Sequence, residues 1–424
     1  MKGLPHVVAV CAFLLSAQQP PPPKSQTPPK QQVPTFRSAT DVVSTHVRVQ
    51  DASGRFIPDL QIKDFEVRED GVLQTISHFA PVVGGRVMAE VVKTADAPLR
   101  EGLILPPPST RPASPGRIFI IFIDDLHLQP LDTNKAKQVL RQIRDTVLHD
   151  DDLVGIVSSG YSSIAVDLSP DTQHLRMNEA IEKVMGAGKT PSEIINTAQT
   201  AEGPAGLRAD AYTAFKVAYD ILAQAEKVTD RRKAFIYVSS GYDFNPFPGA
   251  RYQSIQDLSA RSQPPAGDQG RPPTSTGVGL SRNPFEMNGL QFSQADLARA
   301  LWELILRARR ANVTFYPVDP RGLDAGLDAS LSQTISAQEQ HDFLNTTLSS
   351  LQAVAAGTGG TCICGNNDIK AGLQALDNEM SDYYILGYES NNPDPLKARR
   401  HIEIKVTRRG ARVLPFLDWY SIKR

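Results

Sequence analysis

The stretch RIFIIFIDDLHL, residues Arg117–Leu128, decides the fold class of this chain. A run of β-branched and aromatic residues follows Arg117 and is typical of a strand buried on both faces of a parallel sheet. It stops at Asp124 and Asp125, with His127 two residues on. Ligands of open α/β sheets bind at the carboxyl ends of the strands, so these three side chains are candidates for a functional site. A structural role is the alternative, because aspartates also cap helices and turns.

Apolar periodicity predicts a regular alternation of strands and helices after Arg117. The predicted helices are Thr133–Leu148, His174–Val184, Ala209–Lys227, Gln294–Arg310, Ser349–Ala356 and Ile369–Met380. The predicted strands between them are DLVGIVSS, SSIAVDLS, KAFIYVSS, NVTFYPVD and a short GTCICG. This alternation predicts an α/β fold, a Rossmann-like doubly wound sheet with helices on both faces.

Long connections are confined to one edge of the predicted sheet. They cover Gly186–Arg208, Phe244–Phe292 and Pro320–Phe343, whereas the returns from helix to strand are short. A scaffold with long loops on one edge carries its binding surface there. Within the second loop, the Pro-, Gly- and Ser-rich Ser262–Gly279 is predicted to be disordered.

Strand alternation marks both ends of the chain. A β-rich first part is predicted for 41–100, with Asp70-Gly71 as a hairpin turn, and a second part for 382–424. Each part is too small to be stable alone, so we expect them to form one discontinuous β-sandwich. The α/β domain, 117–381, would be inserted between them behind a Pro-rich linker at 101–116.

The first 17 residues, MKGLPHVVAVCAFLLSA, have the charge, apolar stretch and small residues of a secretory signal peptide. A Pro-rich linker, 18–40, follows, and no other segment is apolar enough to cross a bilayer. We therefore expect a secreted or periplasmic protein without a transmembrane anchor. A net charge of −1, from 45 basic and 46 acidic residues, gives no attraction for nucleic acid.

Several segments together resemble a von Willebrand factor type A domain. They are RIFIIFIDD, KAFIYVSSGYD, NVTFYPVDP and LQAVAAGTGGTCICGNNDI, followed by YYILGYES. The upstream DFEVREDG and downstream RRHIEIKV blocks resemble, more narrowly, the secreted von Willebrand A-related acidobacterial proteins. The resemblance covers nearly the whole chain beyond Asp41 and implies an adhesion or scaffolding module that binds a protein partner.

Domains of this fold bind a divalent cation through an Asp-x-Ser-x-Ser run, a threonine and a later aspartate. Here the run reads Asp124-x-Leu126-x-Leu128, so both hydroxyl ligands are missing. Asp125 and Asp243 are the remaining carboxylates, with vague threonine candidates at Thr197, Thr200 and Thr213. We expect a degenerate metal site formed by Asp124, Asp125 and Asp243. It would hold no cofactor, or magnesium only weakly.

Two repeated VSSGY segments raise a serine hydrolase as the alternative class. Ser159 or Ser240 would be the nucleophile, with His127 or His341 as base, but neither segment has the first glycine of G-x-S-x-G. A purely structural envelope protein is the other alternative. The interpretation we adopt is a non-catalytic interaction module, not an enzyme, that binds an unknown protein at the long-loop edge.

Cys362 and Cys364 are the cysteines that remain beyond the signal segment. In a regular strand their alpha carbons would lie about 6.6 Å apart with parallel side chains, near the upper limit for a disulfide. That geometry favours two buried thiols over a strained, reducible bond.

Overall fold

The structure is a computed structural model of the chain. It describes residues 42–88, 91–92, 117–150, 152–196, 204–228, 232–261, 293–322, 335–391, 399–415 and 419–421. The predicted signal peptide (1–17), both Pro-rich linkers and Ser262–Gly279 lie outside the described residues. No helix in the part that the structure describes is long and apolar enough to span a membrane.

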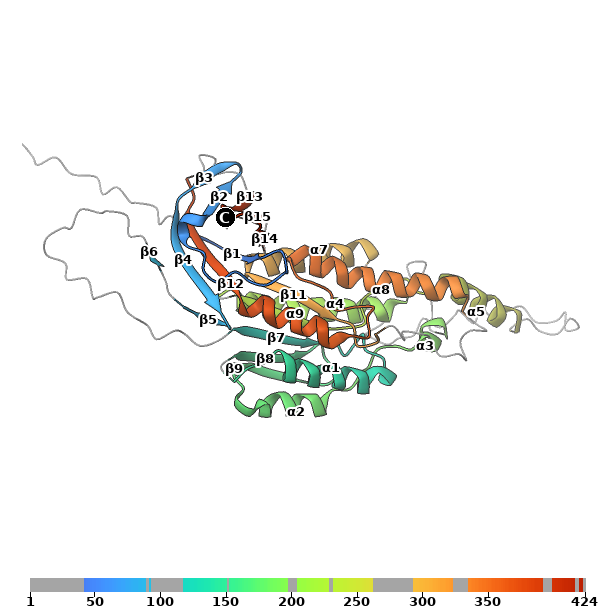
Figure 1. Ribbon diagram of the computed structural model, residues 1–424. Coiled ribbons are helices and arrows are strands. Elements are labelled where there is room, and N and C mark those ends of the chain that lie inside the picture. The colour runs from blue at the N-terminus through green and yellow to red at the C-terminus, as the bar shows by residue number, and fades with distance from the viewer. Residues whose placement is uncertain are drawn as a thin grey trace, which may run out of the picture. The chain divides into compact units, whose positions relative to one another are not determined.

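A five-stranded sheet forms the α/β part, in the order β11-β10-β7-β8-β9 (Figure 1). Its strands are β7 (Ile118–Ile123), β8 (Leu153–Ser158), β9 (Ala165–Pro170), β10 (Lys233–Val238) and β11 (Val313–Val318). All pairs are parallel except β8 with β9. Every residue of β7, β10 and β11 is buried, which explains why these strands are almost wholly apolar, with Lys233 and Thr314 as the polar exceptions. The doubly wound α/β sheet predicted from the sequence is confirmed.

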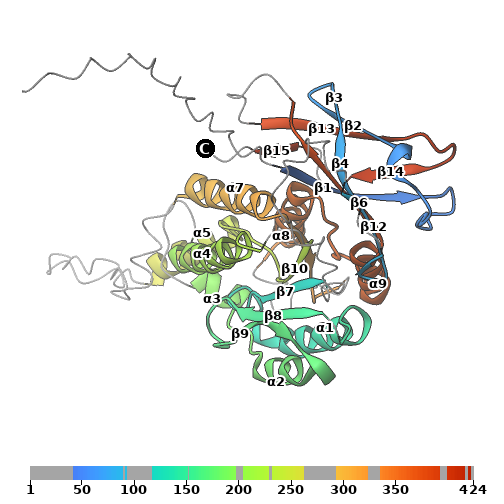
Figure 2. The same cartoon turned by 90° about the vertical axis from the view of Figure 1, so that its left-hand side faces the viewer.

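Helices cover both faces of this sheet. The helices α1 (Thr133–Thr146), α2 (Leu175–Lys183) and α9 (Ile369–Ser381) bury their apolar sides on one face. The helices α4 (Ala205–Ala225), α7 (Gln294–Arg310) and α8 (Ala337–Thr358) cover the other face (Figure 2). The strand order reverses between β7 and β10, so the carboxyl ends of these two strands border the crevice where such sheets bind ligands.

Two predictions within this part are wrong. Helix α8 begins at Ala337 rather than at Ser349, because Ser336 caps it by accepting a hydrogen bond from the Glu339 amide at 3.2 Å. The GTCICG segment is not a strand: only Ile363 bridges to Val318 of β11. The long loops also contain two helices that the sequence does not predict, α3 (Pro191–Asn196) and α5 (Pro248–Arg261).

Strands from the two ends of the chain interleave in two further sheets. One has the order β14-β1-β12-β4-β5, with β6 also paired to β4; the other has the order β15-β13-β2-β3. The first contains β1 (Val42–Gln50), β4 (Ile76–Val83), β5 (Arg86–Val87), β6 (Val91–Val92), β12 (Tyr383–Glu389) and β14 (Arg412–Pro415). The second contains β2 (Phe65–Glu69), β3 (Val72–Gln74), β13 (Arg399–Val406) and β15 (Trp419–Ser421). Because one apolar core includes residues of both sheets, the discontinuous β-sandwich is confirmed.

Tyr384 ties the two ends of the chain together inside that core. The side chain is fully buried, and its hydroxyl donates to the Ile57 carbonyl at 2.6 Å and accepts from the Leu60 amide at 3.1 Å. The predicted hairpin turn is also present, with positive φ at Asp70 (49°) and Gly71 (84°), as a type I′ turn requires. The N-terminal hairpin and the C-terminal strands are therefore one structural element.

The opposite face of the sheet that contains β1 and β12 buries a histidine next to residues of the α/β part. His46 of β1 packs its ring edge against Tyr383, with the ring centroids 5.3 Å apart, and is 4% exposed. Burial, and then the charges of Arg232 and Lys233, lower the pKa of His46 from 6.5 to about 3. The fold therefore holds this imidazole neutral.

His46 should make the stability of the chain depend on pH. The folded chain excludes a proton that the unfolded chain binds below pH 6.5, so stability present above that pH is lost as the pH falls toward 3. The loss is about 1.4 kcal/mol per pH unit. Between about pH 6.5 and 5, urea unfolding of the wild type should lose roughly 2 kcal/mol more than that of His46→Phe.

The control for this comparison is His401→Phe, at an exposed position of β13. It should show the same pH dependence as the wild type. Equal losses of stability in the wild type and in His46→Phe would mean that His46 is not held neutral by the fold.

Candidate functional site: the carboxyl edge of the sheet

Asp124 lies at the carboxyl end of β7 with its side chain fully buried. One carboxylate oxygen, Oδ2, accepts from the hydroxyls of Tyr242 at 2.7 Å, Ser239 at 2.8 Å and Tyr237 at 3.3 Å. The other, Oδ1, lies 2.9 Å from Nδ1 of His127. The lone pairs that would bind a cation are thus directed at the chain's own donors.

The three hydroxyls come from β10 and the turn that follows it. Tyr237 lies within the strand, Ser239 follows its last residue, and the Gly241 turn, with φ of 79°, brings Tyr242 back over Asp124. Burial, and then the nearby negative charge of Asp124, raise the pKa of Tyr237 well above its usual value, so its hydroxyl stays protonated as a donor. Asp124 therefore joins the carboxyl ends of β7 and β10 through side chains.

Asp125 is also fully buried, but it points to a different loop. Its carboxylate accepts from Ser159 Oγ at 2.7 Å, from the Gly160 amide at 3.0 Å and from the Ser162 amide. These donors all follow β8. Asp125 thus has the loop-capping role that the sequence left open as the structural alternative for these aspartates.

Asp243 does not complete a cation site with the other two. It accepts from the Asn245 amide at 2.9 Å, and burial raises its pKa. Within the described ranges, no group of three His, Cys, Asp or Glu side chains is arranged to hold a metal ion. Of the threonine candidates, Thr213 donates to the Ala209 carbonyl within α4, and Thr197 and Thr200 lie outside the described residues.

The residues at the two missing hydroxyl positions have apolar surroundings. Leu128 is fully buried in the core, and partly buried Leu126 lies over Gly160. A leucine offers no lone pair to a hard cation. At both positions the side chain makes packing contacts and offers no ligand oxygen.

Three of the four serines in the two VSSGY segments make hydrogen bonds to carboxylates or to the backbone. Ser159 donates to Asp125, and Ser239 donates to Asp124. The hydroxyl of Ser240 is buried without a hydrogen-bond partner in the described part of the chain. His127 is held by Asp124, and His341 lies exposed on α8 beside Asn345. Among the described hydrogen bonds, none joins a serine hydroxyl to a histidine, so no nucleophile–base pair is assembled.

Three large apolar side chains are exposed on the loops above this edge. Leu131 is 77%, Tyr161 59% and Met185 53% exposed. Their loops are joined: the Ser162 hydroxyl accepts from the Met185 amide at 3.0 Å, and the Gly186 amide donates to Thr133 Oγ1 at 3.0 Å. We call Leu131, Tyr161 and Met185 the loop-edge patch.

The sequence reading missed a buried ion pair at the end of β11. Arg321 contacts Asp319 through Nη2 at 2.8 Å and also donates to the Ser240 carbonyl at 2.7 Å and to Thr347 Oγ1 at 3.1 Å. The arginine therefore joins the ends of β10 and β11 to α8. An Asp-x-Arg sequence directly after a buried strand was the available signal.

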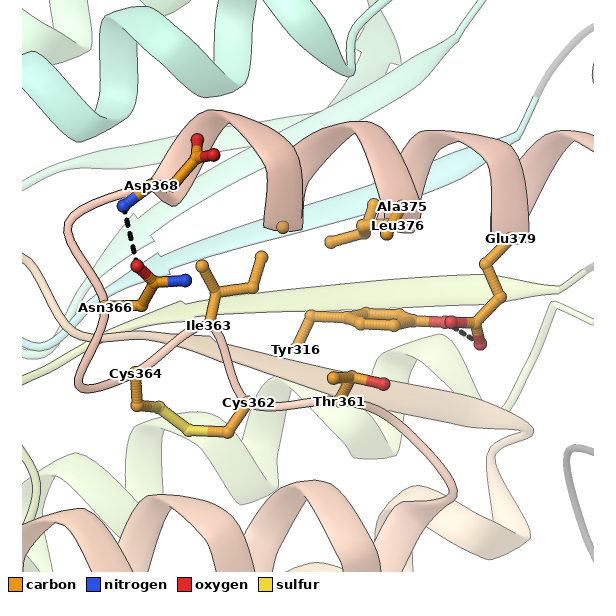
Figure 3. A pocket seen from close by; sticks show the side chains of 11 residues that line it. Tyr316, Thr361, Cys362, Ile363, Cys364, Asn366, Asp368, Ala375, Leu376 and Glu379 are labelled. Carbon is orange, nitrogen blue, oxygen red and sulfur yellow. Dashed lines mark hydrogen bonds between the residues drawn. A yellow bond between two sulfur atoms is a disulfide. The ribbon is translucent and has the colours of Figure 1, made fainter. Parts of the chain in front are cut away.

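The prediction of two buried thiols is wrong. Cys362 and Cys364 form a disulfide, and both side chains are partly exposed. The segment is bent rather than extended, which brings the alpha carbons to 5.4 Å, within the usual range for a disulfide. The disulfide borders a cavity of about 150 Å³ between the Cys segment and α9 (Figure 3).

Comparison with known proteins finds similarity only in structure. No family model and no curated protein matches the chain. Among solved structures, the chain is similar to the von Willebrand factor domain of the type V pili tip protein Mfa5 from Porphyromonas gingivalis. The identity is 10% and the TM-score 0.25, over 58% of this chain and 97% of that chain.

Removal of the Asp124 carboxylate should destabilise the chain strongly. Asp124→Ala leaves buried hydroxyls and an imidazole without their acceptor, so the free energy of unfolding should fall by about 3 kcal/mol. Urea unfolding in a chelator-containing buffer measures it. The control Asp167→Ala, at an exposed position on β9, should stay within about 0.5 kcal/mol of the wild type. A loss below about 1 kcal/mol for Asp124→Ala would show that the carboxylate is not held by these donors.

Proposed function

We propose that this chain is a secreted protein-interaction module of the von Willebrand A-related acidobacterial type. It binds a protein partner at the carboxyl edge of its α/β sheet without a bridging metal ion. The observation that carries this proposal is the saturation of Asp124 by Tyr237, Ser239, Tyr242 and His127, in the place where the fold otherwise presents a cation. The module binds, rather than catalyses, at this edge.

The loop-edge patch supports an apolar partner surface. Large exposed apolar side chains gathered on one edge are typical of interaction sites. Charged side chains beside these loops are paired: Lys135 of α1 with Asp132 at 3.7 Å, and Lys137 of α1 with Glu182 of α2 at 3.9 Å. With a net charge of −1 as well, the chain offers little electrostatic attraction. The partner is therefore a protein that contributes its own apolar side chains to the interface.

A capture experiment from envelope extracts tests the proposal. The double variant Leu131→Ser/Tyr161→Ser should recover a partner at least about tenfold less efficiently than the wild type, because exposed aromatic and aliphatic anchors dominate such interfaces. Chelator should leave the recovery by the wild type unchanged. Quantitative mass spectrometry of the captured proteins provides the measurement.

The matched control is Leu175→Ser. Leu175 is 64% exposed and begins α2, directly after β9 returns to the amino edge of the sheet, opposite the loop-edge patch. This variant should capture as the wild type does. Loss of capture in chelator, or full capture by the double variant, would refute metal-independent docking at the loop edge.

A further inference from the structure

The Cys362–Cys364 disulfide closes a ring over a single intervening residue. A crosslink stabilises a fold mainly by restricting the unfolded chain, and this effect is smallest for the shortest loops. The chain has no other disulfide among the described residues, and its remaining cysteine, Cys11, lies in the predicted signal segment. A structural staple is therefore a poor explanation for this bond.

The backbone around the disulfide is held by contacts that do not involve sulfur. The Ile363 amide donates to the Pro317 carbonyl at 2.8 Å, and the Ile363 carbonyl accepts from the Asp319 amide at 3.1 Å. The Ile363 side chain is 7% exposed and lies against Gly372 of α9, where an added Cβ would come within 2.8 Å of it. Breaking the S–S bond would leave this anchor in place. The two thiols would then stay side by side, ready to form the bond again.

The disulfide packs on one side against the apolar core under α8 and is partly exposed on the other, where a cavity adjoins it. Both cysteines are partly exposed, and Figure 3 shows them on one side of the segment while Ile363 points toward α9. The cavity of about 150 Å³ is lined by both cysteines and by the apolar side chain of Leu376. Thr361 and Asn366, which are exposed, also line it. When a thiol of a partner reacts with the disulfide, this cavity has room for a side chain of the partner that neighbours the thiol.

The two sulfur atoms have different surroundings. Cys364 Sγ lies 3.9 Å from the Pro317 carbonyl oxygen, which would accept the proton of a reduced Cys364 thiol. In the described part of the chain, Cys362 has no corresponding acceptor. A thiol that donates to a carbonyl is kept protonated. Cys362 is therefore the thiol that ionises more readily and forms the mixed disulfide with a partner, and Cys364 is the thiol that closes the bond again.

We propose that Cys362 and Cys364 form a thiol–disulfide exchange site that accepts two electrons from a dithiol. A partner thiolate attacks Cys362 Sγ, the Cys362–Cys364 bond breaks, and Cys364 leaves as a thiolate that takes up a proton. The second partner thiolate then attacks the partner's sulfur in the mixed disulfide and releases Cys362, which takes up the second proton. The partner is oxidised to a disulfide, and the pair is reduced to two thiols. This activity is independent of docking at the loop edge.

A redox titration of the full chain tests whether the bond is exchangeable. In mixtures of reduced and oxidised glutathione, alkylation and mass spectrometry count the thiols on the peptide that contains both cysteines. The reduced fraction should rise from about one tenth to about nine tenths over a roughly hundredfold change in [GSH]²/[GSSG]. The melting temperature of the reduced chain should lie within about 3 °C of the oxidised chain. A pair that stays oxidised throughout, or a reduced chain that unfolds, would identify the bond as structural.

Stoichiometry and single variants test the direction and the order of the exchange. Incubated with a reduced synthetic peptide that carries two cysteines, the oxidised chain should gain two thiols for each peptide disulfide formed. The folded control Cys362→Ser/Cys364→Ser should oxidise none. With oxidised glutathione, Cys364→Ser should form a mixed disulfide at least about tenfold faster than Cys362→Ser. No thiols gained by the wild type would overturn the activity, and equal or reversed rates would overturn the assignment of Cys362.

Discussion

The buried carboxylate of Asp124 is the constraint on which the carboxyl edge depends. An ionised carboxylate in a protein interior costs several kcal/mol unless hydrogen bonds compensate it. Here His127 from the loop after β7, and Tyr237, Ser239 and Tyr242 from β10 and its turn, provide the compensation. The same contacts hold the ends of the two strands together where the strand order reverses. The Asp124 carboxylate, which could otherwise bind a cation, is therefore part of the protein's buried core.

The internal hydrogen bonds of Asp124 and Asp125 determine which groups at the carboxyl edge can contact other molecules. Among the described residues at this edge, Asp124 and Asp125 accept from internal donors, whereas the side chains of the loop-edge patch are exposed. A chemically reactive group, the Cys362–Cys364 disulfide, lies elsewhere, beside β11. This strand and β9 are at opposite ends of the strand order. The sequence predicts a chain that is not an enzyme, and redox exchange at the cysteines is a proposal that goes beyond that prediction. The two proposals therefore fail or stand independently.

The sequence predicts those parts of the fold whose burial produces a clear pattern of apolar residues. Strands β7, β10 and β11 are buried on both faces, and so they appear as nearly continuous apolar runs. The sequence also shows that leucines stand at positions 126 and 128, where a cation site would need hydroxyl oxygens. The sequence does not show the donors to Asp124, because which strand neighbours β7, and how the Gly241 turn directs Tyr242, are properties of the tertiary structure. Regular strand geometry does not predict the disulfide, because the Cys362–Cys364 segment is bent. The start of α8 is set by the Ser336 cap, which apolar periodicity does not reveal.

The most direct test of the central claim is the melting temperature of the wild-type chain in magnesium and in chelator. If Asp124 is saturated by the chain's own hydroxyls, millimolar magnesium should leave the melting temperature unchanged. An ion at a hundred times its dissociation constant would instead stabilise the fold by about 2.7 kcal/mol. A rise in melting temperature with magnesium that is absent in Asp124→Ala would contradict the account and would return a cation to this edge of the sheet.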